Sequence, residues 1–427
     1  MLRLPIGHAA PGLVLARPVL HPKRRGTVLL REGVTLDDLA IRRLTELNVP
    51  LLWVVCPGLE HLARYSSPEI DEACVALASQ IDHACDHDPK HPRLDFPAYR
   101  DAVTTLIHRL VTHPTAAHFL GDLGSSPRLR HAANACLLSI LIGLKLDFYL
   151  VRERPRLSSA KAKELSSLGV GAMLRDFGHG LIAPAALERW ARTADQNDPA
   201  WREHTTLGFD ALKDTLDPSA ASVLLHHHQR FDGTGFPPHT NLDGSSTTPS
   251  GHDIHIFARI VAAADLFDRL RYPPSGLVEG VPARPNVVAL SEIIRPPYRA
   301  WLDPIVMLAL LHAAPAFPPG SMVTLSDGRE AAVVEWNALD PCRPTVRPLD
   351  ILRSPPAPTG EAIDLSRTPT LTITHAEGVP VSGYLFTPDQ PHTFDLATAA
   401  RRMSDRSHLL LDPPPTSPPP TPGGRHR

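Results

Sequence analysis

Residues 225–237 contain three consecutive histidines followed by a glycine-rich turn, and no other stretch restricts the fold of this chain as strongly. They read Leu-His-His-His-Gln-Arg-Phe-Asp-Gly-Thr-Gly-Phe-Pro. Adjacent histidines can both face one metal centre where a helix ends, and the Asp-Gly-x-Gly that follows lets the backbone turn sharply and approach a ligand closely. The alternative is a run of surface histidines before an ordinary turn. A metal centre here would draw further ligands from other parts of the chain.

Four such ligands are available in distant segments, each beside an apolar helical pattern. They are His131 in HAANACLLSILIGL, Asp176 in GAMLRDFGHG, His204 in HTTLGFDAL and Asp265 in FARIVAAADLFD. Asp265 is the most informative, because its helix is almost entirely apolar. A carboxylate buried there without a cation or strong donors would cost several kcal/mol. Taken singly, each of the four is more typical of a satisfied core polar group than of a metal ligand.

Composition excludes several classes of protein. The 427 residues are too many for one ordinary domain and indicate about two to three domains. The 43 Lys+Arg against 45 Asp+Glu argue against a nucleic-acid polymer as partner, which would require a basic surface, but leave room for a small anion. Neither an acidic receiver pattern nor a basic recognition element is visible, which disfavours a response regulator and a transcription factor.

The cysteines and the apolar runs bear on the compartment. The five cysteines are odd in number and form no Cys-x-x-Cys pair, which argues against disulfides and zinc ribbons and favours the cytoplasm. The longest apolar run, 135–144, is too short to cross a bilayer and predicts a buried core helix. The N-terminus lacks the apolar segment of a signal peptide. We therefore expect no membrane association.

The chain divides into five expected regions. Residues 1–57 predict a small α+β module, with strands at 12–20, 27–30 and 51–55 and a helix capped by Thr35. Residues 58–123 predict a helical connector, with one helix starting at Ser67-Pro68 and another running from Pro97 to about His113. Residues 124–350 carry nearly all the clustered histidines. Residues 351–412 form an extension with a strand at 370–374 and a helix at 396–403, and the Pro-rich tail 413–427 is expected to be disordered.

The order of the candidate ligands resembles that of HD-GYP domains. The string from His227 to Pro237 is similar to the family signature HHExxDGxGYP, with Gln229 for Glu and Phe236 for Tyr. Residues 258–268 look like the family's second conserved helix, and 301–304 like its later Asp-Pro element. Residues 319–344 resemble the β-rich segment that often follows, and the N-terminal module is similar to one often found ahead. The resemblance covers most of residues 1–350.

This resemblance implies a mainly α fold: an HD-type helical bundle with a small N-terminal α+β module and a short β-rich C-terminal segment. The family hydrolyses cyclic dinucleotides, chiefly cyclic di-GMP, at bridged metals such as iron or manganese. Close cations neutralise the phosphodiester, orient it and lower the pKa of a bridging water. By resemblance, Asp176 bridges the metals, one metal takes His204, His227 and His228, and the other takes His131 and Asp265. The implied substrate contacts are Arg230, Gly233, Gly235, Phe236, Pro237 and Arg271.

The sequence departs from the family pattern at several of these positions. The His-Asp dyad is Arg175-Asp176, and arginine stays protonated and cannot replace an imidazole ligand. His179 stands where the family has lysine. The carboxylate of a third metal site would fall at Pro127, which argues against a trinuclear centre. The Arg-Pro-Tyr element after Asp265 is shortened to Arg271-Tyr272-Pro273.

Three outcomes follow for the expected catalytic residues Asp176, His179 and Arg175. One metal survives with Arg175 as a fixed cation and supports slow phosphodiesterase activity. Alternatively, His179 rescues the second metal, since it lies four residues after Arg175 and would share its helical face. Thirdly, the site binds a cyclic dinucleotide or metal without turnover, as a sensor or scaffold in signalling. One or two metals per chain, and a homodimer or a signalling protein partner, stay open.

Overall fold

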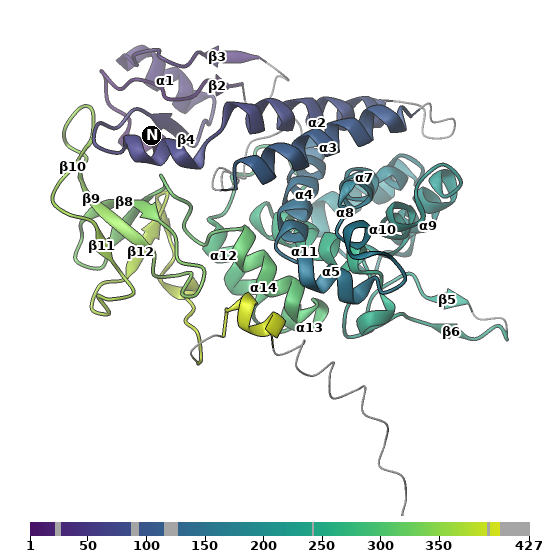
Figure 1. The fold of residues 1–427 in the computed structure, drawn as a ribbon. Helices are drawn as coiled ribbons and strands as arrows, with labels where there is room; N and C mark the ends of the chain where they lie inside the picture. Colours follow the sequence, from purple (N-terminus) through teal and green to yellow (C-terminus); the bar gives the residue numbers. More distant parts are fainter. Residues whose placement is uncertain (22–26, 87–93, 115–126, 241–242, 391–392, 402–427) are drawn as a thin grey trace, which may run out of the picture.

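The computed structural model describes residues 1–21, 27–86, 94–114, 127–240, 243–390 and 393–401. Helices predominate and gather in one body, while most strands gather in a second body beside it (Figure 1). The prediction of a mainly α chain is therefore confirmed. The expected boundary near residue 123 and the Pro-rich tail 413–427 lie outside the described residues.

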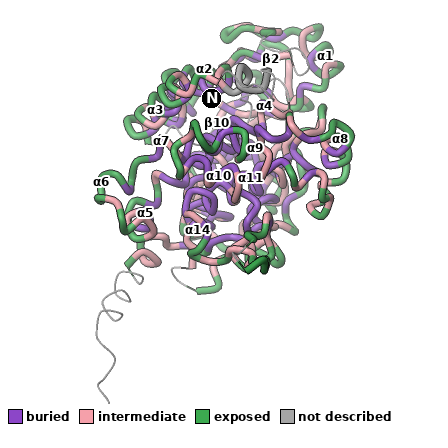
Figure 2. The backbone as a smooth tube through the Cα atoms, turned by 90° about the vertical axis from the view of Figure 1, so that its right-hand side faces the viewer, coloured by how far each residue is buried: buried purple, intermediate pink, exposed green. Residues whose placement is uncertain are grey.

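The helical body is built around α4, which is buried along almost its whole length from His131 to Gly143. A helix that is apolar on every side belongs in a core, and α4 packs against α2, α7, α11 and α14. Figure 2 shows buried residues concentrated in the interior, around α9, α10 and α11. The core helix predicted from the apolar run 135–144 is confirmed. In the described part of the chain no single helix is long and apolar enough to span a membrane, although α4 and α5 together, bent by 89°, satisfy the same criterion.

The bounds of the helical elements are as follows. The α-helices of this body are α2 (Pro68–Asp86), α3 (Phe96–Thr112), α4 (Pro127–Leu144), α5 (Asp147–Glu153), α6 (Ser159–Ala162), α7 (Ser166–Leu174), α8 (Pro184–Thr193), α9 (Pro199–Leu212), α10 (Pro218–His226), α11 (Ile256–Arg271), α12 (Asn286–Ile293), α13 (Tyr298–Trp301) and α14 (Pro304–Ala313). Two short 3-10 helices, η3 (Phe177–Gly180) and η4 (Gly251–Asp253), and the hairpin of β5 (His239–Thr240) with β6 (Ser246–Thr247) connect them.

Asp-Pro pairs set the starting points of three of these helices. In α9, α10 and α14 an aspartate is the N-cap and proline is the first helical residue, which is the arrangement that leaves fewest unsatisfied N–H groups. The Asp198 carboxylate accepts from Ala200 N at 3.0 Å, and Asp217 accepts from Ser219 N at 2.9 Å. These caps fix where α9 and α10 begin; His204 lies in α9, and His227 and His228 directly follow α10.

The N-terminal module contains β1 (Leu2–Pro5), η1 (Ile6–His8), β2 (Val19–Leu20), β3 (Val28–Leu30), α1 (Asp38–Glu46), β4 (Leu51–Val54) and η2 (Glu60–Tyr65). Strands β1 and β4 pair antiparallel, with Leu2 opposite Val54. The described residues of 1–57 contain both strands and a helix, but Thr35 as the helix cap was wrong. Asp37 caps α1 by accepting from Ala40 N at 2.7 Å, while Thr35 forms a β-bridge with Val14.

The C-terminal strands form one sheet that also closes the core of the N-terminal module. Their bounds are β7 (Met322–Leu325), β8 (Glu330–Glu335), β9 (Thr345–Asp350), β10 (Ala357–Pro358), β11 (Ile363–Asp364), β12 (Ile373–Ala376) and β13 (Val379–Pro380), with η5 (Ser382–Tyr384) after them. Met322 and Val334 share an apolar core with Leu2 and Leu4, and Arg3 pairs with Glu377 at 3.0 Å.

The predicted β-rich segment is therefore present, but the expected boundary at residue 350 falls inside its sheet. Strand β10 pairs with β9, and β12 pairs with β7. The strand expected at 370–374 begins at Ile373 and ends at Ala376. The helix expected at 396–403 is helical from residue 396 to the end of the described chain at residue 401.

Candidate metal centre

Six predicted ligands from five separate segments gather around Asp176 in the helical body. Asp176 directly follows α7, His204 lies in α9, and His227 and His228 follow α10. His131 lies in α4 and Asp265 in α11. Their ligand atoms form two groups that share Asp176: one with His204, His227 and His228, the other with His131 and Asp265. Within each group all ligand atoms lie within 4.8 Å of one another.

Two glycines allow Asp176 to approach α9. A Cβ added to Gly178 would lie 1.9 Å from the backbone oxygen of His204 and 2.9 Å from the backbone nitrogen of Gly208. Only a residue without a side chain fits at that distance. The backbone of η3 therefore rests directly on α9, which holds Asp176 beside His204.

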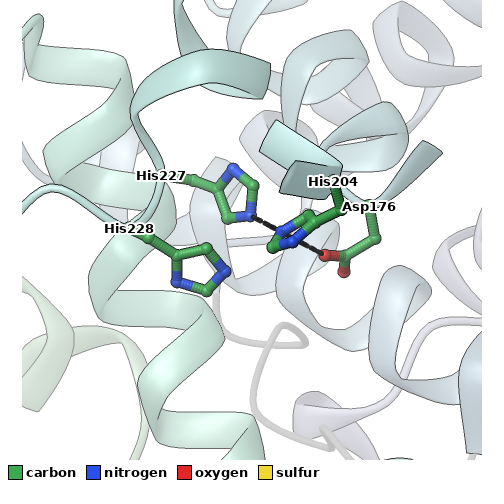
Figure 3. Close-up of side chains that lie close together, drawn as sticks. All are labelled: Asp176, His204, His227 and His228. Atoms are coloured by element: carbon green, nitrogen blue, oxygen red, sulfur yellow. Dashed lines mark hydrogen bonds and ion pairs between the residues drawn. The ribbon is translucent and has the colours of Figure 1, made fainter. Parts of the chain in front are cut away.

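The two oxygens of Asp176 face different surroundings. We call the group around Oδ1 (Asp176, His204, His227 and His228) the histidine side, and the group around Oδ2 (Asp176, Arg175, His131 and Asp265) the arginine side. On the histidine side, Oδ1 lies 3.7 Å from His227 Nε2 and 3.9 Å from His204 Nε2. Figure 3 shows the His227 ring pointing toward His204 and Asp176, with His228 beside it.

Hydrogen bonds to backbone carbonyls fix which ring nitrogen carries the proton in two of these imidazoles. His204 Nδ1 lies 2.6 Å from Trp201 O, and His227 Nδ1 lies 3.1 Å from Val223 O and from Leu224 O. A carbonyl only accepts, so both Nδ1 atoms are donors and both Nε2 atoms bear lone pairs. Those two Nε2 atoms face each other at 3.4 Å. Metal-ligating histidines have this same arrangement, in which the ring nitrogen away from the metal donates to a carbonyl oxygen.

His228 completes the histidine side. Its Nε2 is buried and has no hydrogen-bond partner among the described residues. Burial lowers the pKa of His204 and His228 well below the usual range, which keeps both rings neutral. Neutral imidazole is the form that binds a metal. The partly buried Asp176 carboxylate with three buried imidazoles around it therefore fits one divalent cation that takes nitrogen and oxygen ligands.

A cation from the chain itself occupies the arginine side. The Arg175 guanidinium is fully buried; its Nη2 lies 3.1 Å from Asp176 Oδ2, and its Nε lies 3.2 Å from Asp265 Oδ1. Nη1 donates to Ala172 O at 3.0 Å, one of the free carbonyls at the end of α7. The guanidinium therefore links the two carboxylates and anchors itself to the helix from which it comes.

The remaining polar atoms of the arginine side are also engaged. His131 Nε2 lies 3.0 Å from Asp265 Oδ1, and His131 Nδ1 lies 2.8 Å from Asp268 Oδ2. The other oxygen of Asp265 accepts from Arg269 Nε at 2.8 Å. Asn134 donates to Asp268 at 2.9 Å. The expectation that Asp265 needs cations or strong donors is confirmed.

The charges of the arginine side hold its carboxylates ionised. Burial alone would raise the pKa of Asp265, but Arg269, the His131 hydrogen bond and Arg175 keep it well below its usual range. Burial and Arg175 oppose protonation of His131, but its hydrogen bonds to Asp265 and Asp268 outweigh them and raise its pKa. Burial would likewise raise the pKa of Asp176, which Arg175 and the neighbouring histidines depress well below normal.

His179 does not reach the arginine side, so it cannot rescue a second metal there. The argument from helical spacing was wrong because α7 ends at Leu174 and His179 belongs to η3. Its Nε2 lies 3.8 Å from Asp176 Oδ1, on the histidine side, and accepts from Trp201 Nε1 at 3.2 Å. An indole N–H only donates, so this lone pair is already used. Burial lowers the pKa of His179 to about 4.

The loop after the histidines supports the site from behind. Phe236 is buried and stacks on His228, with ring centroids 4.8 Å apart. A Cβ on Gly235 would lie 2.4 Å from Arg230 N, so the turn requires glycine. The Arg230 guanidinium lies 3.5 Å from the Trp301 ring centroid and contacts Gln196 and Thr234. In this loop Phe236 packs on the candidate ligand His228, while Gly233 and Arg230 are only partly buried.

Arg271 lies apart from the centre. Its side chain lines a small cavity between the helical body and the C-terminal sheet, together with Arg3, Asn286, Ser321 and Glu377. The structure therefore does not bring Arg271 to the histidine side or the arginine side.

Four residues that take part in the centre were not predicted from the sequence. They are Asn134, Trp201, Asp268 and Arg269. Helical spacing could have found three of them, because Asn134 lies three residues after His131, and Asp268 and Arg269 lie three and four residues after Asp265. Trp201 has no comparable signal, since it acts through its backbone carbonyl and its indole N–H on two different histidines.

Comparison with known proteins identifies relatives of one named activity. No protein-family model matches the chain. The chain is 26% identical over 370 residues to the cyclic di-GMP phosphodiesterase PA4108 of Pseudomonas aeruginosa. This match covers 79% of the chain and 82% of that protein. It is 31% identical over 124 residues to the cyclic di-GMP phosphodiesterase response regulator RpfG of Xanthomonas campestris, and 29% identical over 107 residues to a cyclic di-GMP phosphodiesterase of Vibrio cholerae. These two matches cover 30% and 20% of the respective relatives. The chain is thus similar over most of its length to one protein named a cyclic di-GMP phosphodiesterase, and over shorter parts to two others.

Proposed function

We propose that this chain is a divergent HD-GYP-type phosphohydrolase that hydrolyses cyclic di-GMP at a metal held on the histidine side. The observation that carries the proposal is the pair of Nε2 atoms of His204 and His227, which face each other at 3.4 Å beside the partly buried Asp176 carboxylate. Both rings are held in this tautomer by backbone carbonyls. A cation or a proton between them removes the repulsion of two lone pairs aimed at each other, and the carboxylate beside them favours a cation.

Asp176, His204, His227 and His228 would hold the ion, with iron or manganese as the expected metals. A bound dication neutralises phosphodiester charge and lowers the pKa of a coordinated water. The chain's own residues supply the rest. Trp201 and the end of α10 orient the imidazoles, while Phe236 fixes His228. Arg230, half-buried in the loop, is the residue that we expect to contact a phosphate of the dinucleotide.

A second candidate function is a binding module without turnover, and Arg175 favours it. The resemblance implies two bridged metals, and the arginine side holds a guanidinium where one of them would sit. Such a chain would bind cyclic di-GMP and leave it intact. Both candidate functions require binding of cyclic di-GMP, and they differ only in whether the chain hydrolyses it.

The test is turnover by the purified full chain with Mn²⁺ or, without oxygen, Fe²⁺. Products of cyclic di-GMP are separated by chromatography, and binding is measured by calorimetry. If the chain is an enzyme, wild type and His226→Ala should form a linear dinucleotide, and His227→Ala should form none. His226 is the control because its imidazole faces His239 instead of the centre. If wild type binds cyclic di-GMP but forms no product with either metal, the chain is a binding module and not an enzyme.

A further inference from the structure

We infer that the Arg175 guanidinium is a permanent second cation, so that this centre holds one metal ion and not two. The inference rests on the proposed metal of the histidine side and concerns what lies across Asp176 from it. The relevant donors are His131, Asp176 and Asp265, which by position alone could hold an ion. The question is whether those donors are available.

The guanidinium already makes the contacts that a bridging ion would make. It reaches Asp176 Oδ2 through Nη2 and Asp265 Oδ1 through Nε, at 3.1 and 3.2 Å. Arginine stays protonated in proteins and presents its donors in a rigid planar fork that matches carboxylate oxygens. Unlike an ion, it cannot leave, because it is part of the chain.

The other donors of the arginine side are held by partners from the chain. Both ring nitrogens of His131 face carboxylates, Asp265 at 3.0 Å and Asp268 at 2.8 Å. The second oxygen of Asp265 binds Arg269. An incoming ion would have to displace these partners and also stand beside the guanidinium. The residues present therefore do not fit a second metal.

Arg175 acts as a positioning residue in this arrangement. Its side chain has no exposed surface, so it cannot touch a substrate. It holds Asp176 through Oδ2 while Oδ1 faces the histidines. A single metal on Oδ1 and a guanidinium on Oδ2 would give the carboxylate the same bridging role between two cations that it would have between two metals.

The experiment counts manganese per chain after equilibration with excess Mn²⁺ and removal of unbound metal, in wild type, Arg175→His and Arg175→Lys. Elemental analysis should give about one ion in wild type and about two in Arg175→His, because a neutral imidazole replaces the guanidinium. Arg175→Lys keeps the charge and should stay at about one. Electron paramagnetic resonance should show isolated Mn²⁺ in wild type and an exchange-coupled pair in Arg175→His.

Two ions in wild type would overturn the inference whether or not any variant folds. A folded Arg175→His protein that still binds one ion would also overturn it. Failure of the proposed function would give a different result: His227→Ala would then bind as much metal as wild type. The two failures are distinguishable because His227 lies on the histidine side and Arg175 on the arginine side.

Discussion

The two sides of Asp176 contain similar residue types and satisfy them in opposite ways. On the histidine side, three imidazoles and one carboxylate oxygen face each other, and no described side chain brings a cation between them. On the arginine side, carboxylates and an imidazole are joined by Arg175 and Arg269. A cluster of ligand types therefore does not by itself make a metal site. What decides is whether the chain already supplies the cation.

Electrostatic repulsion adds to the cost of placing a metal ion beside the Arg175 guanidinium on the arginine side. At an effective dielectric constant of about 20, two unit charges about 4 Å apart interact by about 4 kcal/mol, so a dication beside a guanidinium would meet about 8 kcal/mol of repulsion. From the histidine side, the Arg175 guanidinium lies across the Asp176 carboxylate. The same carboxylate thus shields one cation from the other.

The largest effect should come from removing a ligand of the histidine side. His227→Ala should abolish turnover and weaken metal binding by more than about 100-fold, since losing even an outer-shell partner of a ligand costs about 10–100-fold. Metal affinity by calorimetry and product formation check this. His226→Ala, one residue earlier in the same triplet, is the matched control and should resemble wild type. Equal losses of metal affinity in His227→Ala and His226→Ala would show that the histidine side does not hold the metal.

The next largest effect should be a loss of stability caused by a substitution on the arginine side. Asp265→Asn leaves Arg175 and Arg269 without their shared carboxylate, and breaking a buried ion pair costs about 3–5 kcal/mol. Urea unfolding measures the loss.

This loss should depend on pH in a defined direction. The pKa of Asp265 is depressed in the folded chain, so its contribution is complete above the unfolded pKa of about 3.9 and disappears as the pH falls through the folded value. The difference in unfolding free energy between wild type and Asp265→Asn should therefore be constant near neutral pH and shrink below about pH 4. A difference that grows on acidification would contradict the assigned ion pairs.

A smaller effect should come from the backbone contact that holds η3 against α9. Gly178→Ala places a methyl group against the His204 carbonyl, and overpacking of this kind costs about 1–3 kcal/mol. The shift of η3 should also weaken metal binding, because Asp176 moves away from His204. Gly383→Ala, where a Cβ meets nothing within 4 Å, is the matched control. Unchanged metal affinity in a destabilised Gly178→Ala protein would show that the contact serves the fold alone.

The smallest effect should come from Trp201→Phe. This change removes the indole donor to His179 but keeps the backbone carbonyl that orients His204. Metal affinity should fall by less than about 10-fold, at the low end for loss of an outer-shell partner. A loss as large as that of His227→Ala would mean that His179 is itself a ligand.

The sequence predicted the elements better than the details of their contacts. Apolar periodicity and length identified the core helix around 135–144, and the Ser67-Pro68 start was correct because caps are local. Thr35 failed as a cap since Asp37 competes for the same N–H groups and Thr35 pairs with Val14. The boundary at 350 failed because strand pairing joins residues far apart in the sequence, as in β12 with β7.

At the centre, residue types and their order predicted which side chains converge but not how their charges are shared. Asp265 was recognised as needing a cation, yet its two guanidiniums come from different helices. His179 was misplaced because the end of α7 at Leu174 has no strong signal in the sequence. The position of Arg175 between Asp176 and Asp265 depends on tertiary packing that no local pattern encodes.

The most direct test of the central claim is the anomalous scattering of manganese in crystals of the wild-type chain. We predict one peak, next to Asp176 Oδ1 and the Nε2 atoms of His204 and His227, with ordinary density for the Arg175 guanidinium between Asp176 Oδ2 and Asp265. A second manganese peak between those two carboxylates, with Arg175 turned away, would contradict the account.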